Sequence, residues 1–521
     1  MRREEVRLLF KGKLAVNLAL LAILVVGFAL RLHDLGKHDL WFDEIITYDY
    51  ISKPYSWGSQ DFINNFIEKN PPLYFILLRQ WSDLFGKSEF SLRFLSLFFG
   101  VLSIFLLYKL SRIFFDHKTS LLGAVFLSLS PFQIWYCQEA RAFTLSLLLS
   151  LSSSYFFLRS FKNNDTKSWV LYSFSSLLLL FTTYYAAFIL IPQGLLLILY
   201  QRKLFFRWAA FLLPPAALFL IFIFPVFAHQ LAIVRYKSWL PPPANAASML
   251  ETLKNFVVGY NAGESVYLCI LPLILGLCLY ASFGIPAVPL TALLLFGLAP
   301  VILIFTFSKA FFPVYIDRHL IIFSPFIYIL LSKGVVSIKH AWLKLLVIVL
   351  VIGCVLFGVF NYYRDILPDR RANTMVFLKR PVRPIVEIFL KNRREGDAIG
   401  FSNYGFMNIF RHYLENESKE YPAIPKFYFF IPGGDEFFEF QIGAMKSNGF
   451  KNEFKFINLE KFAPEGLAGR RIWLFSSSWK RSGNLEPNGR KVKSWFDEHY
   501  SRIREWYYDG AWIGIYEPLK R

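Results

Sequence analysis

The sequence predicts a polytopic helical membrane domain followed by a small α/β domain. Of the 521 residues, 55% are hydrophobic and 19% aromatic, only 18% are charged, and the mean hydropathy is +0.41. A soluble domain is usually about a quarter charged. Apolar runs long enough to cross ~30 Å of hydrocarbon recur between residues 14 and 361. After residue 361, polar stretches alternate with short strand-like runs.

Eleven spanning helices are expected in the first part of the chain, because lipid offers no partners to unpaired backbone groups. The expected spans are residues 14–32, 90–110, 119–136, 142–160, 168–185, 187–201, 207–228, 267–283, 288–308, 319–332 and 342–361. The first follows five basic residues, and no small-residue cleavage site comes after it. We therefore expect an uncleaved anchor rather than a removed signal peptide.

Basic residues in the short loops predict a cytoplasmic N-terminus, since Lys and Arg gather on the cytoplasmic side. They cluster before the first span and in alternating loops, near residues 109–118, 159–167, 202–207 and 333–344. This orientation depends on residues 71–85, an apolar stretch that is short for a span. We interpret it as an interfacial helix on the outer surface. We expect a multi-pass protein of the bacterial cytoplasmic (inner) membrane.

Two domains follow from this reading. Residues 1–361 form the transmembrane domain, whose first extracytoplasmic loop is residues 33–89, and residues 362–521 form a soluble α/β domain on the same outer face. Helical spacing is expected over residues 493–506 of the second domain. Its expected strands are residues 398–401, 426–431, 454–457, 471–476 and 512–516.

Charge and motif content exclude several function classes. The net charge of +20 lies largely in short loops and in the basic tail domain, with no nucleic-acid motif around it. Topogenic residues and attraction to anionic lipid explain this charge better than nucleic-acid binding does. The four cysteines are too scattered for a disulfide framework. The sequence contains no Gly-rich phosphate loop, no Cys/His metal spacing and no nucleophile elbow. We therefore expect the sugar donor to be carried by the membrane rather than to be a soluble sugar nucleotide.

The first candidate motif is Trp-Phe-Asp-Glu at residues 41–44, just beyond the first span. Its carboxylates, Asp43 and Glu44, could be an ordinary solvated charge pair, and the aromatic residues an interfacial anchor. A second acidic motif on the same face favours function instead. Carboxylates held near an interface are suited to general-base work or to metal coordination.

The second motif is Gln-Glu-Ala-Arg at residues 138–141, after Pro131 has loosened the outer end of the third span. Glu139 and Arg141 could simply pair with each other. The functional alternative is that Arg141 grips a phosphate through its fork of donors, while Glu139 orients it or a substrate hydroxyl. Gln138 belongs to the same candidate set.

Five further residues are candidates, Arg318 for binding the donor phosphate and the other four for substrate binding or structural roles. Arg318 supplies another cation at the outer level, beside His319, although this could be only a helix-end cluster. Asn70 and Tyr74 flank two prolines that we interpret mainly as structural punctuation. Tyr185 could stack on a sugar or mark the membrane interface, and we favour the interface.

Taken in order, the motifs resemble the GT-C glycosyltransferases, and more narrowly the protein-mannosyltransferase and aminoarabinose-transferase-like branch (glycosyltransferase family 39/83 type). The resemblance is strongest over residues 14–200. Asn70 stands where many relatives have His, and Cys137 where many have Ser, which leaves the sugar and the acceptor open. The motifs lie at residues 41–44, 71–74, 88–93 and 130–141.

This resemblance implies transfer of one sugar from a polyprenyl-phosphate carrier to a lipid, glycan or protein acceptor outside the cytoplasm. Asp43 would match the catalytic acidic residue of the first loop, and Arg141 a residue near the donor phosphate. The expected chemistry is inverting displacement with Asp43 as the base and cations on the leaving phosphate. No cofactor is certain, and a divalent metal on Asp43 or Glu139 stays open.

Two competing functions are a transporter or lipid flippase and an oligosaccharide ligase with a lipid-pyrophosphate donor. A transporter would place ionisable residues near mid-membrane on broken helices, often in repeated halves. Here the charges cluster at the outer rim, and the sequence shows no repeat. A scaffolding membrane protein is a third alternative, and it would tolerate Asp43→Asn.

Overall fold

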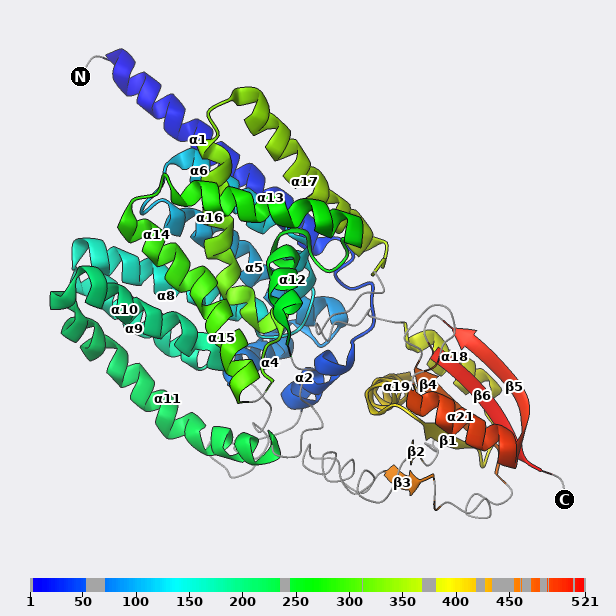
Figure 1. The fold of residues 1–521 in the computed structure, drawn as a ribbon. Helices are drawn as coiled ribbons and strands as arrows, with labels where there is room; N and C mark the ends of the chain where they lie inside the picture. The colour runs from blue at the N-terminus through cyan, green and yellow to red at the C-terminus, as the bar shows by residue number, and fades with distance from the viewer. Residues whose placement is uncertain are drawn as a thin grey trace. The chain divides into compact units, whose positions relative to one another are not determined.

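The structure is a computed structural model, and the chain divides into two compact units (Figure 1). Unit 1 comprises Met1–Lys37, Glu68–Ala228 and Leu240–Leu378, and unit 2 comprises His38–Ile67, His229–Trp239 and Lys379–Arg521. The described residues are 3–52, 71–234, 244–311, 313–367, 381–417, 427–432, 454–459, 461, 470–477, 485, 487–508 and 511–519.

Unit 1 is built from helices. They are α1 (Arg3–Leu32), α4 (Leu73–Phe85), α5 (Glu89–Ser111), α6 (His117–Leu129), α7 (Pro131–Cys137), α8 (Phe143–Asn163), α9 (Thr166–Leu180), η1 (Tyr184–Ala186), α10 (Ala187–Tyr200), η2 (Arg202–Leu204), α11 (Phe205–Val234), α12 (Ala246–Val258), α13 (Glu264–Ser282), α14 (Ala287–Leu293), η3 (Leu294–Leu298), α15 (Ala299–Ala310), η4 (Asp317–Phe323), α16 (Ser324–Ser337) and α17 (Ala341–Tyr363).

Each of the eleven segments expected to span coincides with helix. Within the described residues, seven helices are long and apolar enough to cross a membrane, or eight if the bent pair α6 and α7 counts as one span. The other three expected spans are the serine-rich α8 and the shorter α9 and α10, with 15 and 14 residues. At 1.5 Å per residue the last two reach only about 22 Å. The count of eleven therefore stays a prediction.

The expected interfacial segment forms α4, a helix of 13 residues that is too short to cross hydrocarbon. It begins directly after Pro71 and Pro72, and it has a buried face that includes Tyr74 and Leu78. Its helical structure is confirmed, and its position along the membrane surface stays a prediction.

Small residues let the helices of unit 1 approach closely, as is typical of helix interfaces in lipid. A Cβ atom on Gly334 of α16 would lie 2.4 Å from the Leu277 carbonyl oxygen of α13. Ser153 of α8 and Ser176 of α9 join their hydroxyls at 3.0 Å. Close packing thus brings polar side chains of neighbouring helices, such as these two serines, within hydrogen-bond distance.

Unit 2 contains a six-stranded sheet in the order β3-β2-β1-β4-β6-β5. The first four strands in that order run parallel, and β6 and β5 are antiparallel to their neighbours. The elements of unit 2 are α2 (Phe42–Ser52), α18 (Arg383–Asn392), β1 (Ala398–Phe401), α19 (Tyr404–Glu417), β2 (Phe427–Ile431), β3 (Phe454–Asn458), β4 (Ile472–Ser477), α21 (Pro487–His499), β5 (Tyr500–Tyr508) and β6 (Ala511–Pro518).

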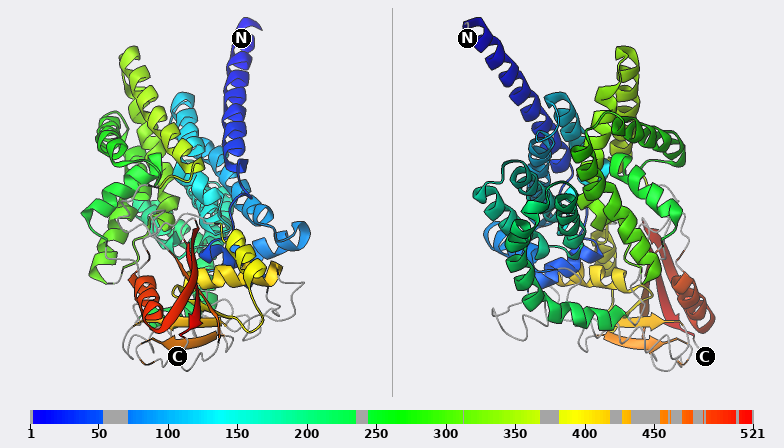
Figure 2. Two further views of the ribbon diagram at one scale, coloured as in Figure 1. Left: turned by 90° about the vertical axis from the view of Figure 1, so that its right-hand side faces the viewer. Right: turned by 60° about the vertical axis from the view of Figure 1, so that its left-hand side comes forward.

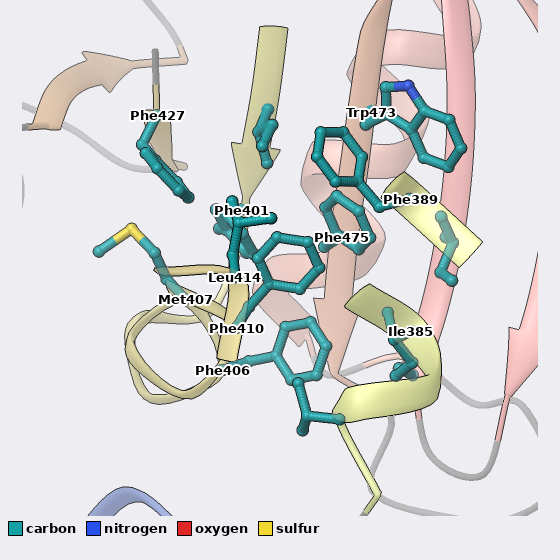
Figure 3. Packing of buried hydrophobic residues seen from close by; sticks show 14 of the residues in the cluster. Ile385, Phe389, Phe401, Phe406, Met407, Phe410, Leu414, Phe427, Trp473 and Phe475 are labelled. Carbon is teal, nitrogen blue, oxygen red and sulfur yellow. The ribbon is translucent and has the colours of Figure 1, made fainter. Parts of the chain in front are cut away.

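Helices cover both faces of this sheet, with α21 on one side and α18 and α19 on the other (Figure 2). Phe389 of α18 and Phe410 of α19 pack against Phe475 and Trp473 of β4 (Figure 3). These rings are fully buried, and each aromatic side chain removes roughly 150–250 Å² from water. The predicted α/β class of the C-terminal region is therefore confirmed.

All five predicted strands are present, but the predicted helix over residues 493–506 is wrong at its end. Helix α21 stops at His499, and the edge strand β5 begins at Tyr500. A bulge between Arg502 and Arg504 leaves Ile503 out of register and 54% exposed. The extra residue breaks the two-residue alternation of the strand, so its apolar spacing imitates that of a helix.

Candidate active site

The Gln-Glu-Ala-Arg motif lies on a buried turn that follows a broken helix. Helices α6 and α7 are bent by 57° at Ser130, whose hydroxyl accepts a hydrogen bond from the Gln133 amide at 3.4 Å. Pro131 occupies the first position of α7, where its missing N–H costs nothing. The kink predicted at Pro131 is therefore present. The seven-residue helix α7 then ends at Cys137. The whole motif is buried.

Gln138 ties this turn to two other helices. Its amide nitrogen donates to the carbonyl oxygens of Arg31 at 3.0 Å and His33 at 2.6 Å. Its amide oxygen accepts a hydrogen bond from the Tyr362 hydroxyl at 2.5 Å. Both ends of the amide thus hold the turn in place, and the predicted role of Gln138 at the donor phosphate stays a prediction.

Glu139 and Arg141 each contact an aromatic side chain. The Glu139 carboxylate is 2% exposed and accepts a hydrogen bond from the Trp135 indole nitrogen at 2.7 Å. The Arg141 guanidinium lies 6.0 Å from the centre of the Phe75 ring. The Ser96 hydroxyl, which the Tyr74 hydroxyl meets at 2.8 Å, also donates to the Arg141 carbonyl at 3.3 Å.

Arg31 of α1 is a buried cation that the sequence reading missed. It is 1% exposed and donates to the carbonyl oxygens of Leu127 at 2.9 Å and Ser128 at 2.8 Å, which the break after α6 leaves without helical partners. Its Nε atom also donates to the Cys137 sulfur at 3.1 Å. Arg31 therefore stabilises the broken helix from which the motif emerges. An arginine inside an apolar span was the available signal.

A cleft beside this turn gathers the predicted cations. Its described lining contains two arginines and several hydroxyl groups, and no Asp or Glu lies in that part of the wall. Guanidinium groups with nearby hydroxyls suit a phosphate or phosphodiester. The lining residues are Arg141, Ala142, Phe143, Ser146, Thr182, Thr183, Arg318, His319 and Ile321.

Neighbouring groups hold the far wall of the cleft. Asp317, 4% exposed, accepts hydrogen bonds from Thr252 and Asn255 of α12, both at 2.6 Å. Its carboxylate is thus fastened to α12 by neutral donors. His319 stacks parallel to the Tyr185 ring at 4.9 Å, so Tyr185 supports the wall rather than lining the cleft.

The Trp-Phe-Asp-Glu motif begins α2 in unit 2, and the structure separates the roles of its two carboxylates. Glu44 is fully buried, and its carboxylate accepts a hydrogen bond from the Trp41 amide at 3.4 Å, as in half of a capping box. Asp43 is partly exposed, and its carbonyl oxygen accepts a hydrogen bond from Thr47. Of the two carboxylates, Asp43 is therefore the more accessible one.

The other predicted residues differ in outcome. Tyr74 is fully buried and acts through Ser96, so its role is structural. Asn70 lies outside the described residues. Across the parts of the chain that the structure describes, no group of three or more His, Cys, Asp or Glu residues could hold a metal ion.

A family model described as dolichyl-phosphate-mannose-protein mannosyltransferase matches residues 69–229. This stretch contains Gln138, Glu139, Arg141 and the two threonines of the cleft, and it ends before Arg318. No curated protein matches the chain.

Two solved structures share the fold. ArnT from Cupriavidus metallidurans in the apo state is 13% identical with a TM-score of 0.57, and the match covers 97% of this chain and 98% of that chain. The same protein bound to undecaprenyl phosphate is 12% identical with a TM-score of 0.56, over 96% and 97% of the two chains. The predicted GT-C resemblance is confirmed, and together with the family match it supports a glycosyltransferase in an integral membrane protein.

Proposed function

We propose that this chain is a membrane glycosyltransferase that moves a single sugar, a hexose or a pentose, from a polyprenyl-phosphate carrier to an acceptor at the extracytoplasmic face. The observation that carries the proposal is the cleft, whose lining contains the Arg141 and Arg318 side chains together with hydroxyl groups. A transferase of this kind must hold a lipid phosphate and stabilise the charge that develops as it leaves. ArnT, which shares the fold, has been captured with undecaprenyl phosphate.

The proposed reaction is a direct displacement. The acceptor oxygen attacks the anomeric carbon from the face opposite the phosphate, forming the new glycosidic bond with inversion. The bond between that carbon and the phosphate oxygen breaks, and its electron pair leaves with the lipid phosphate. Asp43 accepts the proton of the attacking hydroxyl.

The residues divide the work between binding and proton transfer. Arg141 and Arg318 provide charge-assisted hydrogen bonds to phosphate oxygens, and they gain strength as negative charge accumulates on the leaving group. Glu139, held by Trp135, orients the motif around Arg141. A correctly placed base and a preorganised cation each contribute factors of roughly 10² to 10⁴ in rate.

The test is a transfer assay with the purified full-length protein. Radiolabelled polyprenyl-phosphate sugars are incubated with the protein and total membrane extract, and the labelled product is identified. We expect transfer of one sugar from a monophosphate carrier, and loss of transfer in Asp43→Asn with normal expression. Use of a lipid-pyrophosphate oligosaccharide instead would indicate a ligase, and lipid translocation in vesicles without any sugar transfer would indicate a flippase.

A further inference from the structure

We infer that the α/β domain positions the catalytic carboxylate, through contacts of α18 and α19 with residues 38–52, which we call the acidic segment. The inference deepens the proposed function and rests on the role of Asp43 as the base. All the contacts lie within unit 2, because the acidic segment belongs to the same compact unit as the C-terminal residues. The α/β domain is then part of the catalytic apparatus.

The first contact is made by Asp39. One carboxylate oxygen accepts hydrogen bonds from the backbone amides of Val382 at 2.6 Å and Arg383 at 2.9 Å, and the other lies 3.6 Å from Arg383 Nε. These amides begin α18, where N–H groups lack partners inside the helix and where the helix dipole favours a negative charge. Asp39 is 7% exposed, so its contacts with α18 are shielded from water.

The second contact fixes the backbone three residues before Asp43. The Leu40 amide donates to the Tyr413 hydroxyl of α19 at 2.6 Å, and both side chains are buried. The Arg383 guanidinium lies 4.8 Å from the centre of the Tyr413 ring. Tyr413 and Arg383 thus hold α18, α19 and the entrance of α2 in one arrangement.

The third set of contacts lies along α2. Phe42 packs edge to face on Tyr404 at 5.9 Å and joins the hydrophobic core beneath the sheet. Further along α2, the Tyr48 ring packs edge to face on the His412 ring, with 4.5 Å between the ring centres.

An ion pair completes the set, with Asp49 lying 3.6 Å from Arg411 Nη2. Residues 42 and 49 are seven apart and therefore share a helix face. The adjacent Asp43 is not part of that face and remains partly exposed. The helix that carries Asp43 is consequently held by α18 and α19.

This arrangement predicts a split between turnover and donor binding. The arginines of the cleft belong to unit 1, whereas the acidic segment and its contacts belong to unit 2. Loosening α2 should misplace the base and lower kcat, while the affinity for polyprenyl phosphate should not change. A small misplacement of a catalytic group can cost about 10²-fold in rate.

The experiment uses the full chain and two single variants. Tyr413→Phe removes only the hydroxyl that accepts the Leu40 amide, and Arg411→Asp reverses one charge of the ion pair. The double variant Asp49→Arg, Arg411→Asp restores the opposite charges. We expect roughly 10- to 100-fold lower kcat in each single variant, unchanged polyprenyl phosphate affinity, and recovery of kcat in the double variant.

The matched control is Arg394→Ala, which breaks an ion pair of the same 3.6 Å length with Glu517 elsewhere in unit 2. It should keep wild-type kcat. Wild-type kcat in folded Tyr413→Phe and Arg411→Asp, or an equal loss of donor binding, would overturn the inference. Full activity in Asp43→Asn would instead overturn the proposed base, so the two failures are distinguishable.

Discussion

The two units place charged side chains by different means. In unit 1, Arg141 and Arg318 line a cleft supported by buried hydrogen bonds between helices. In unit 2, Asp43 begins a short helix whose opposite face is fastened to an α/β domain. A cation inside an apolar bundle requires such polar support, because an unsatisfied buried group is costly. A base must exchange protons with its substrate, and a partly exposed site permits that.

The largest effect is expected at Asp43. Replacement by Asn should lower kcat by roughly 10² to 10⁴, because the amide cannot accept the acceptor proton. Glu44→Gln is the matched control, since the buried Glu44 side chain accepts the Trp41 amide and a Gln oxygen can replace it. Transfer assays should show a loss only in the first variant, and equal losses would contradict the separation of roles.

The next effect tests the cleft. Arg141→Met and Arg318→Met should each weaken polyprenyl phosphate binding by about 10- to 100-fold, because a hydrogen bond to a charged group contributes about 1.5–3 kcal/mol. Equilibrium binding of the unlabelled lipid phosphate measures this directly. Asp43→Asn should bind the same lipid normally. Unchanged binding in both arginine variants would remove the cleft from the donor site.

An effect on stability is expected from the support of the broken helix. Arg31→Met should lower thermal stability by about 2–5 kcal/mol, because two buried carbonyl groups lose their donor. The stability of Arg31→Lys should lie between those of Arg31→Met and the wild type, since an ammonium cannot reproduce the guanidinium fork. Thermal unfolding in detergent provides the measurement, and wild-type stability in Arg31→Met would contradict this role.

A pH dependence of stability is expected at Lys254 of α12. Burial lowers the pKa of Lys254 from 10.5 to about 8, while Glu251 and Asp317 oppose the shift. Between about pH 8 and 10.5 the unfolded chain holds this proton and the folded chain does not, so the stability of the folded state rises with pH. The total gain is about 3 kcal/mol. The free energy of unfolding of the wild type, minus that of Lys254→Met, should rise over this pH range. A difference that does not change with pH would contradict the prediction.

Local sequence was sufficient for the helices at the eleven expected spans, though not for α12, and for the strands at residues 398–401 and 512–516, because apolar periodicity reflects local burial. It also identified Asp43 and Arg141 as candidate site residues. A charged side chain beside an apolar span costs free energy, so its presence there indicates a function. Local sequence failed at Ile503, where a bulge changed the period, and it could not reveal that the Gln138 amide contacts carbonyl and hydroxyl groups far away in the sequence.

What the sequence by itself determined is the membrane class, the order of the elements and the chemical types in the two motifs, because these depend on composition and short-range spacing. Only the tertiary structure decided that Glu44 is buried while Asp43 is accessible, that Arg31 supports the break after α6, and that the acidic segment packs with the C-terminal domain. Those outcomes depend on contacts between residues separated by about a hundred positions or more, and no local pattern encodes such pairings.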